Sequence, residues 1–180
     1  MNNLDNKIAE KFQKMSLSFD DEYIDYAMRF AKIGSDGTKA SGFALKTGYE
    51  AFIYSALIGI NTGHRVSLQN RTRKVIQNYF SATWRNHLWY LFSLLISKEE
   101  IQKEIGLCDE KLNITPALFE ENKINFSVII DKLVDIVREF SNGGLLYIKE
   151  KLDDDDFDVG KYSCFHELYK ETLPTEADSK

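Results

Sequence analysis

Cysteine and proline are both scarce in this sequence. Its 180 residues include only two prolines and two cysteines, Cys108 and Cys164. Neither cysteine belongs to a CxxC pair or to a Cys/His ligand spacing, which excludes the common zinc motifs and argues against the disulfide framework of a small secreted domain. With 43% hydrophobic residues and so few prolines, the composition is that of a folded domain and not of a disordered chain. We therefore expect a folded protein from a reducing compartment.

Secretory and membrane-spanning signals are also missing. Residues 1–12 lack the basic start and the continuous apolar core of a secretory signal. The most apolar run, Leu88 to Ile96, falls far short of the ~20 residues that a helix needs to cross a bilayer, so we expect it at the centre of the core. These absences predict a cytoplasmic protein without a membrane partner.

Acidic residues are absent from residues 51–98, which carry six basic ones. The whole chain nevertheless has a net charge of -5, because residues 99–180 contain 20 acidic and 10 basic residues. This layout is typical of a surface that binds an anionic partner. It is equally typical of a basic segment that pairs with acidic helices of the same fold.

Two ligand-binding motifs are absent. Residues 35–43 (SDGTKASGF) contain glycines but not the GxxxxGK[ST] spacing of a phosphate-binding loop, and we expect a connecting loop there. The acidic run DDDDFDVG does not meet the spacing of an EF-hand, because the twelfth position counted from Asp154 is Phe165. A solvated acidic turn is the favoured interpretation, and imitation of DNA towards a basic partner is the lesser one.

The side chains that could perform catalysis are dispersed. Cys164 and His166 are two positions apart, so a helix would point them in different directions. His87 is expected at the edge of the core beside Trp84 and Leu88, and the remaining histidine, His64, is far away in sequence. We therefore expect no catalytic residue, no metal ligand and no cofactor. A hydrolase whose site assembles from dispersed residues is an alternative that no spacing supports.

Helix start and stop signals divide the chain. Thr47 and Glu50 have the spacing of a capping box, and apolar residues then recur every three or four positions up to Ile60. Gly63 offers a left-handed stop, so we predict a helix from about Gly48 to Asn61. Two further capping signatures are Ser18 with Asp21 and Ser97 with Glu100, and their stops are Gly34 and Gly106.

Helical spacing continues through the rest of the chain. Residues 75–95 fit one long helix, or two helices that are broken near residues 81–83. Asn142, Gly143 and Gly144 predict a break between a helix over 126–140 and another over 145–152, and we leave open whether the two helices are nearly collinear. A short helix is predicted around Tyr162 to Glu171, and no stretch alternates as a strand would.

The sequence therefore predicts an all-α protein. We expect a single compact multi-helix domain of about six to eight helices over residues 1–152, and we leave open how firmly residues 1–15 are attached to it. Residues 153–180 form an acidic C-terminal segment with the short helix just described.

Candidate binding residues lie in the basic stretch 64–85. Their side chains could contact phosphates, and they are His64, Arg65, Arg71, Arg73, Lys74 and Arg85. Tyr79, Phe80 and Trp84 could stack on unpaired bases. The favoured alternative is that these aromatic side chains belong to the core and that the arginines pair with acidic helices, because the aromatic residues fit an apolar helical stripe.

Two motifs carry a resemblance to a known group of proteins. The segment Lys46 to Leu68 contains YEAF (49–52), ALIG (56–59) and GHRVSL (63–68), and FSNGGL follows at 140–145. In this order they resemble the motifs of small accessory proteins that are associated with Dnd-type DNA phosphorothioation and defence clusters. The resemblance implies an accessory role beside bacterial DNA modification and restriction, and it implies no catalytic residues.

Three functions follow from these observations. The leading hypothesis is a non-enzymatic accessory or protein-interaction module linked to bacterial DNA modification and defence. A nucleic-acid-binding protein that uses residues 64–85 is the first alternative, and the dispersed hydrolase is the second. We expect another protein as the partner, and we leave DNA or a second copy of the chain open as alternatives.

Overall fold

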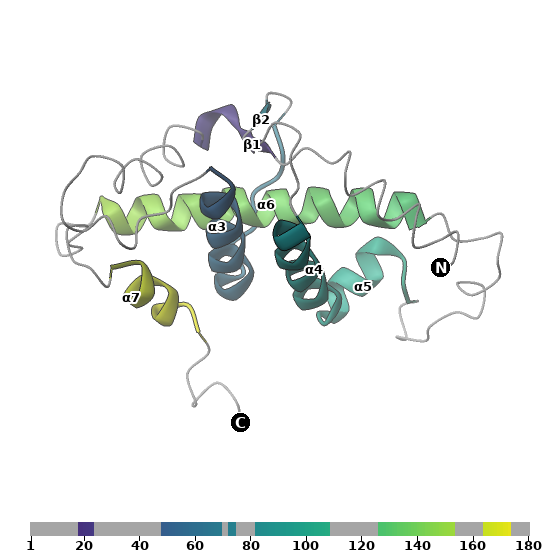
Figure 1. Cartoon of the computed structure of the whole chain (residues 1–180). Coiled ribbons are helices and arrows are strands. Elements are labelled where there is room, and N and C mark those ends of the chain that lie inside the picture. The colour runs from purple at the N-terminus through teal and green to yellow at the C-terminus, as the bar shows by residue number, and fades with distance from the viewer. Residues whose placement is uncertain are drawn as a thin grey trace. The chain divides into compact units, whose positions relative to one another are not determined.

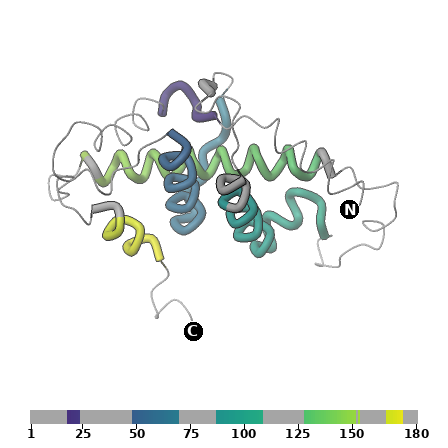
Figure 2. Tube along the Cα trace, viewed as in Figure 1, coloured from purple at the N-terminus to yellow at the C-terminus, as the bar shows by residue number. Residues whose placement is uncertain are grey.

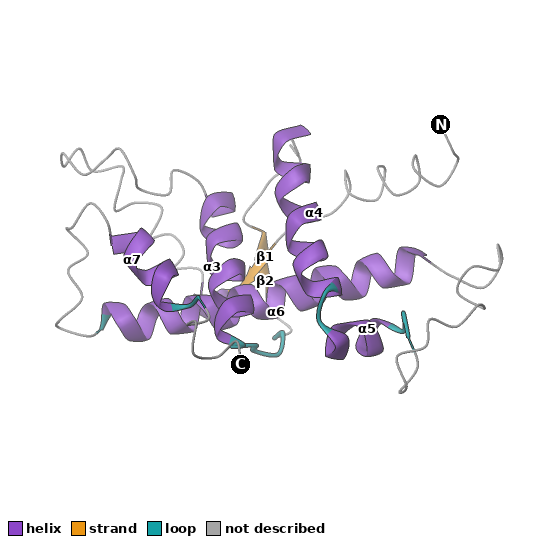
Figure 3. Ribbon diagram, turned by 90° about the horizontal axis from the view of Figure 1, so that it is seen from below, coloured by secondary structure: helices purple, strands orange, loops and turns teal. Residues whose placement is uncertain are grey.

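The computed structural model describes residues 18–23, 48–69, 72–74, 82–108, 126–153 and 164–173 (Figure 1, Figure 2). Most of these residues are helical. The helices are α3 (Gly48–Thr62), α4 (Ala82–Ile96), α5 (Glu99–Ile105), α6 (Phe126–Leu152) and α7 (Cys164–Glu171). The strands β1 (Ser18–Asp20) and β2 (Thr72–Lys74) form one antiparallel pair in which Phe19 faces Arg73 (Figure 3). The prediction of an all-α protein is confirmed, and this short strand pair is an addition that the sequence did not predict.

The chain divides into two compact units. One comprises residues 1–16 and 78–137, and its described part contains α4, α5 and the beginning of α6. The other comprises residues 17–77 and 138–180, with β1, α3, β2, the remainder of α6 and α7. The single domain expected over residues 1–152 stays a prediction.

The first unit has its core on one side of α4. Leu88, Leu91, Phe92 and Leu95 are at most 1% exposed, which confirms that the apolar run belongs to the core. His87 was expected at the core edge and is exposed instead. Ile101 and Ile105 of α5 and Leu133 of α6 are also buried in this unit.

The ends of α5 test one start signal and one stop signal. The stop is confirmed, because Gly106 adopts φ 81° and its N–H donates to backbone carbonyls of the last turn. The start is corrected: the helix is preceded by Lys98, and no side chain caps it. Ser97 instead donates its hydroxyl to the carbonyl of Leu94, 2.7 Å away, because it directly follows the last turn of α4.

The second unit confirms one predicted helix and corrects another helix start. The helix expected over residues 48–61 is α3, and Gly63 follows it with φ 71°. Ser18, which was expected to cap a helix, lies in β1 opposite Lys74. The backbone becomes helical only at Asp21, because Ser18 to Asp20 satisfy backbone groups through the strand pair. Phe19 packs on Phe52 with 5.4 Å between the ring centroids.

The break predicted at Asn142, Gly143 and Gly144 is wrong. Helix α6 runs without interruption from Phe126 to Leu152. The short helix expected around Tyr162 to Glu171 is confirmed as α7. Among the described residues, no helix combines the length and apolar composition that a membrane crossing requires.

Several predictions fall on residues outside the described ranges. They concern the attachment of residues 1–15, the stop at Gly34, the loop 35–43, residues 75–81, the cap at Thr47 and the acidic run after Asp153. Arg71 also lies outside them. For Arg73, Lys74, Trp84 and Arg85 the structure describes the backbone but not the side chain.

Candidate functional site

The second unit is built on a close crossing of α3 and α6 (Figure 1, Figure 3). A Cβ atom at Gly59 would overlap the carbonyl of Phe140, and one at Gly144 would overlap the carbonyl of Ser55. One at Gly143 would overlap the carbonyl of His64. Glycine at these positions lets the two backbones approach until they touch. The crossing therefore joins the two sequence motifs that carry the resemblance to Dnd-associated proteins.

Two buried serines satisfy each other inside this crossing. The hydroxyls of Ser55 on α3 and Ser141 on α6 lie 2.7 Å apart, and both residues are fully buried. Ser55 also donates to the carbonyl of Phe52 at 3.0 Å. A buried hydroxyl without a partner would destabilise the fold, so this network stabilises one alignment of the two helices.

A buried carboxylate holds the chain that follows α3. Asp20 is fully buried, and its Oδ2 accepts a hydrogen bond from the backbone N–H of Gln69 at 2.7 Å. The backbone N–H of Asp20 donates to Oδ1 of the buried Asn142 over 3.5 Å. Asp20 Oδ1 and Asn142 Nδ2 have no hydrogen-bond partner. The strand β1 therefore links the segment 64–69 to α6.

Segment 64–69 is extended and lies against α6. The N–H of Val66 donates to the carbonyl of Glu139 at 3.1 Å, and Arg65 forms an ion pair with the Glu139 carboxylate. The guanidinium of Arg65 also lies 5.8 Å from the centroid of the Phe140 ring. Arg65 thus has a structural role, as the alternative interpretation of the basic stretch predicts for the arginines.

A row of three side chains joins the first residue of this segment to α6. His64 is exposed, and its ring centroid is 5.7 Å from that of Tyr147 on α6. Lys151, one turn further along α6, places Nζ 5.8 Å from the centroid of the same ring. Lys151 also forms an ion pair with Glu171 of α7 at 2.8 Å. We call His64, Tyr147 and Lys151 the aromatic–basic row.

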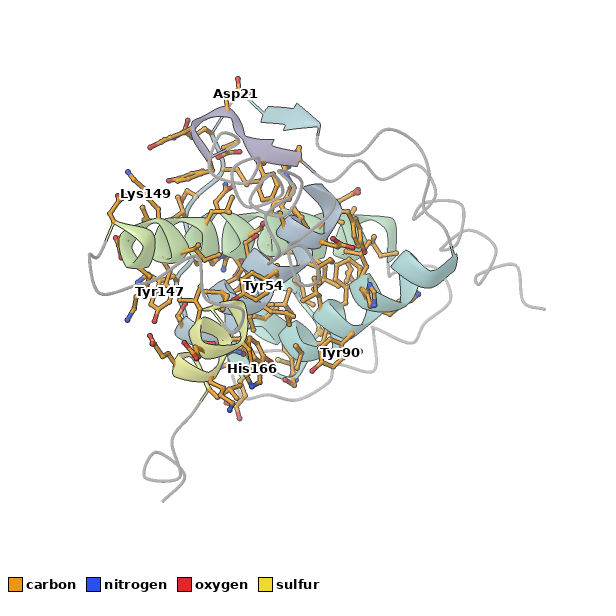
Figure 4. All side chains as sticks on the ribbon, turned by 60° about the vertical axis from the view of Figure 1, so that its left-hand side comes forward. Asp21, Tyr54, Tyr90, Tyr147, Lys149 and His166 are labelled. Carbon is orange, nitrogen blue, oxygen red and sulfur yellow. The ribbon has the colours of Figure 1, made fainter. Side chains whose placement is uncertain are left out.

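Figure 4 shows Tyr147 on the side of α6 that faces α7, whereas Lys149 points to the opposite side. Tyr147 and Lys151 are four residues apart on a helix, so they share a face. Sequence analysis missed both residues as site candidates. Their spacing was visible, but only the fold reveals that their face of α6 meets His64.

The six candidate binding residues do not form one described cluster. His64 and Arg65 are adjacent on the extended segment, and Arg73 and Lys74 lie on β2 in the same unit. Arg85 is on α4, in the other unit, and Arg71 lies outside the described residues. The structure thus brings only part of the predicted surface onto a single unit.

The first unit exposes two large aromatic side chains on α4. Trp89 is 45% exposed and Tyr90 is 56% exposed, although Leu88 and Leu91 on either side of them are fully buried. Trp89 meets Phe92 edge-on, with 6.2 Å between the ring centroids, and Tyr90 lies at the outer side of the helix (Figure 4). We call Trp89 and Tyr90 the α4 aromatic pair.

Two tyrosines in the second unit have perturbed acidity. Burial raises the pKa of the Tyr49 phenol, because the phenolate would lose its hydration. Burial also raises the pKa of Tyr23, and the neighbouring carboxylates of Glu22 and Asp20 add to the effect. Both phenols therefore stay protonated at neutral pH.

Within the part of the chain that the structure describes, no group of three His, Cys, Asp or Glu side chains is placed to hold a metal ion. The absence of a metal, a cofactor and a catalytic residue stays a prediction. Comparison of the chain with protein-family models, with curated proteins and with solved structures finds no match.

Proposed function

We propose that the protein is a non-enzymatic interaction module of the bacterial cytoplasm that binds another protein and acts beside DNA modification and defence. The observation that supports binding is the α4 aromatic pair, with Trp89 45% and Tyr90 56% exposed. Burying large aromatic side chains on folding stabilises a protein, so two adjacent exposed ones on a helix favour an interface. Tryptophan and tyrosine are also enriched among the residues that dominate the affinity of protein interfaces.

The link to DNA modification rests on the two sequence motifs. They lie about 80 residues apart in the chain, yet Ser55 and Gly59 of the first touch Phe140, Ser141 and Gly144 of the second. One helix crossing thus gives a common structural reason for both motifs. This supports treating them as a single signature, and the accessory role that they imply is part of the proposal.

Coexpression with the proteins of a Dnd-type cluster tests this function. Size-exclusion chromatography of the mixture should show a stable complex that contains this chain. Amide hydrogen exchange across residues 87–97 should slow in the complex, because the α4 aromatic pair becomes covered. Exchange of the exposed end of α7 should stay unchanged. A mixture in which the components elute separately, or a complex that leaves α4 exchange unchanged, would contradict the proposal.

Nucleic-acid binding is a second candidate, and the aromatic–basic row favours it. A partly accessible aromatic ring flanked by cationic or imidazole side chains is an arrangement that can stack an unpaired base and contact its phosphate. His64, Tyr147 and Lys151 provide these groups. The ion pair of Arg65 with Glu139 argues against a phosphate contact by Arg65 itself.

Fluorescence anisotropy with labelled single-stranded and double-stranded DNA tests the second candidate. We expect binding at low salt that weakens as salt is added, because phosphate contacts release counterions. The double variant Arg71→Ala/Arg73→Ala should bind more weakly and with a smaller dependence on salt. An absence of binding at low salt would assign these charges to internal pairing.

A further inference from the structure

In the aromatic–basic row, the ring of Tyr147 lies within 6 Å of both the His64 ring and the Lys151 ammonium. Tyr147 is half-buried, whereas His64 is exposed and Lys151 keeps 35% of its side-chain surface. A nucleotide carries its base and its phosphate close together, so one nucleotide could stack near Tyr147 and place its phosphate at Lys151. The chemistry of this row suits a single strand, whose bases are free to stack.

Helix α7 already supplies an anion at this position. Glu171 places its carboxylate 2.8 Å from the Lys151 ammonium, where a phosphate oxygen would otherwise bind. The C-terminal segment 153–180, α7 included, contains nine acidic and three basic residues. The carboxylate of Glu171 thus occupies the cation that a nucleic acid would need.

The described contacts of α7 and the two residues after it include a buried leucine, a long hydrogen bond and an ion pair accessible to solvent. Its one fully buried described side chain is Leu168, and Thr172 accepts a long hydrogen bond of 3.4 Å from Asn61 at the end of α3. The Lys151–Glu171 pair is exposed on both sides, with 35% and 47% of the side-chain surface accessible. An exposed pair of this kind shifts an equilibrium by a factor of about two to five.

We propose that His64, Tyr147 and Lys151 form a binding site for single-stranded DNA and that α7 closes this site through Glu171. The inference rests on the second candidate function, nucleic-acid binding, and adds to it the site and its internal competitor. Single-stranded DNA displaces the Glu171 carboxylate from Lys151, and α7 moves away from the row. The C-terminal segment thereby limits binding to strands that compete successfully with it.

The test measures the affinity of the full-length protein for a labelled oligo-dT strand at low salt. Glu171→Gln removes the competing charge without changing the size of the side chain, and it should tighten binding about two- to fivefold. Glu167→Gln is the matched control, because it removes the same charge from the same helix one turn away. The control should change the affinity less than twofold. Leu168→Ala, which loosens α7 as a whole, should tighten binding at least as much as Glu171→Gln.

A further variant ties the effect to the row. Adding Tyr147→Ala to Glu171→Gln should abolish the gain in affinity, because the stacking surface is lost. Hydrogen exchange of residues 164–173 should quicken in Glu171→Gln and in Leu168→Ala without DNA, which reports the release of α7 directly. Circular dichroism would verify that each variant keeps its helices.

Four results would overturn the inference. Equal gains for Glu171→Gln and Glu167→Gln would reduce the effect to net charge, and a gain that survives Tyr147→Ala would place the site elsewhere. If Arg71→Ala/Arg73→Ala weakens DNA binding while Glu171→Gln leaves it unchanged, nucleic-acid binding stands as the second candidate function. Only the proposed closing of the site by α7 then fails. If no variant binds DNA at low salt, both fail, and the proposed protein-binding function of α4 is unaffected.

Discussion

Two ion pairs of α6 differ in their surroundings, and this decides what each cation can do. Arg65 and Glu139 keep 31% and 19% of their side-chain surface, and the Arg65 guanidinium also lies over Phe140. Lys151 and Glu171 keep 35% and 47%. Solvent and salt screen the second pair more strongly, so Lys151 exchanges its anion more easily than Arg65 does. A phosphate would therefore displace the carboxylate partner of Lys151 more easily than that of Arg65.

At the residue scale, Tyr49 predicts a pH dependence. An unperturbed tyrosine has a pKa of 10.0, and burial raises that of Tyr49 above this value in the folded state. Below pH 10 the phenol is neutral in both states, and its contribution to stability is fully present. Above pH 10 the unfolded phenol ionises first, so stability falls as pH rises towards the folded pKa. Tyr49→Phe should lessen this loss by up to about 1.4 kcal/mol per pH unit.

Urea unfolding of the wild type and Tyr49→Phe between pH 8 and pH 11.5 measures this difference. The free energies of unfolding should run parallel up to about pH 10 and then diverge, with the variant losing less. Tyr23 titrates in both proteins and cancels from the comparison. Curves that stay parallel up to pH 11.5 would contradict the assignment.

The sequence could not predict which side chains contact each other in the fold. The basic residues of the stretch 64–85 are visible in the sequence, but their partners are not, because Glu139 lies 74 residues from Arg65. The same holds for Tyr147, whose neighbour His64 comes from another element. A local signature near a helix end also gave a wrong prediction. Ser97 fits the pattern of a helix cap, yet its hydroxyl donates to the carbonyl of Leu94 in the preceding turn.

At the element scale, the crossing of α3 and α6 explains why α6 does not break. Glycine is a poor helix former, and Gly143-Gly144 in isolation predicts an interruption. In the fold these positions face the carbonyls of His64 and Ser55, where no other residue fits. The packing of the two helices outweighs the low helix propensity. The sequence alone could not reveal this, because it does not show which helix packs against residues 143 and 144, although both motifs were noted for their resemblance to those of Dnd-associated proteins.

The crossing predicts that alanine at a contact glycine lowers the free energy of unfolding, whereas helix propensity alone predicts that it raises this free energy. Propensity alone would make Gly144→Ala stabilising by about 1 kcal/mol. Because the added Cβ overlaps the carbonyl of Ser55, we expect it to lower the free energy of unfolding by about 3 kcal/mol instead. Gly63→Ala is the matched control: that position has φ +71° but open space, so it should cost about 1 kcal/mol.

Urea unfolding at neutral pH measures both glycine variants. The control separates backbone strain at a left-handed position from overlap between two helices. If Gly144→Ala proved as stable as the wild type, or more stable than Gly63→Ala, the close approach of α3 and α6 would be refuted.

At the scale of the whole molecule, helical periodicity predicted the fold class and the positions of α3, α5 and α7. It worked because these helices bury one apolar side, as Leu88 to Leu95 also do in α4. Strands β1 and β2 were not predicted, because a strand of three residues is too short to show the alternation of apolar and polar residues. The exposure of Trp89 and Tyr90 could not be foreseen, since the apolar run around them indicated only burial.

The distribution of charged residues along the chain can also be interpreted at this scale. The acid-free stretch begins in α3 and ends after α4, and one of its arginines pairs with α6. Part of the basic excess is thus used inside the fold, as one of the two original interpretations held. The surface that most favours a partner is instead aromatic and lies on α4.

The affinity of a purified Dnd-cluster protein for the wild type and for Trp89→Ala/Tyr90→Ala tests the proposed function most directly. We predict that the double variant binds at least tenfold more weakly, because two large aromatic contacts are lost. Leu173→Ala, which removes an apolar side chain that is 42% exposed on the other unit, should stay within about twofold of the wild type. Unchanged affinity of the double variant, with its helical content intact, would contradict the proposal.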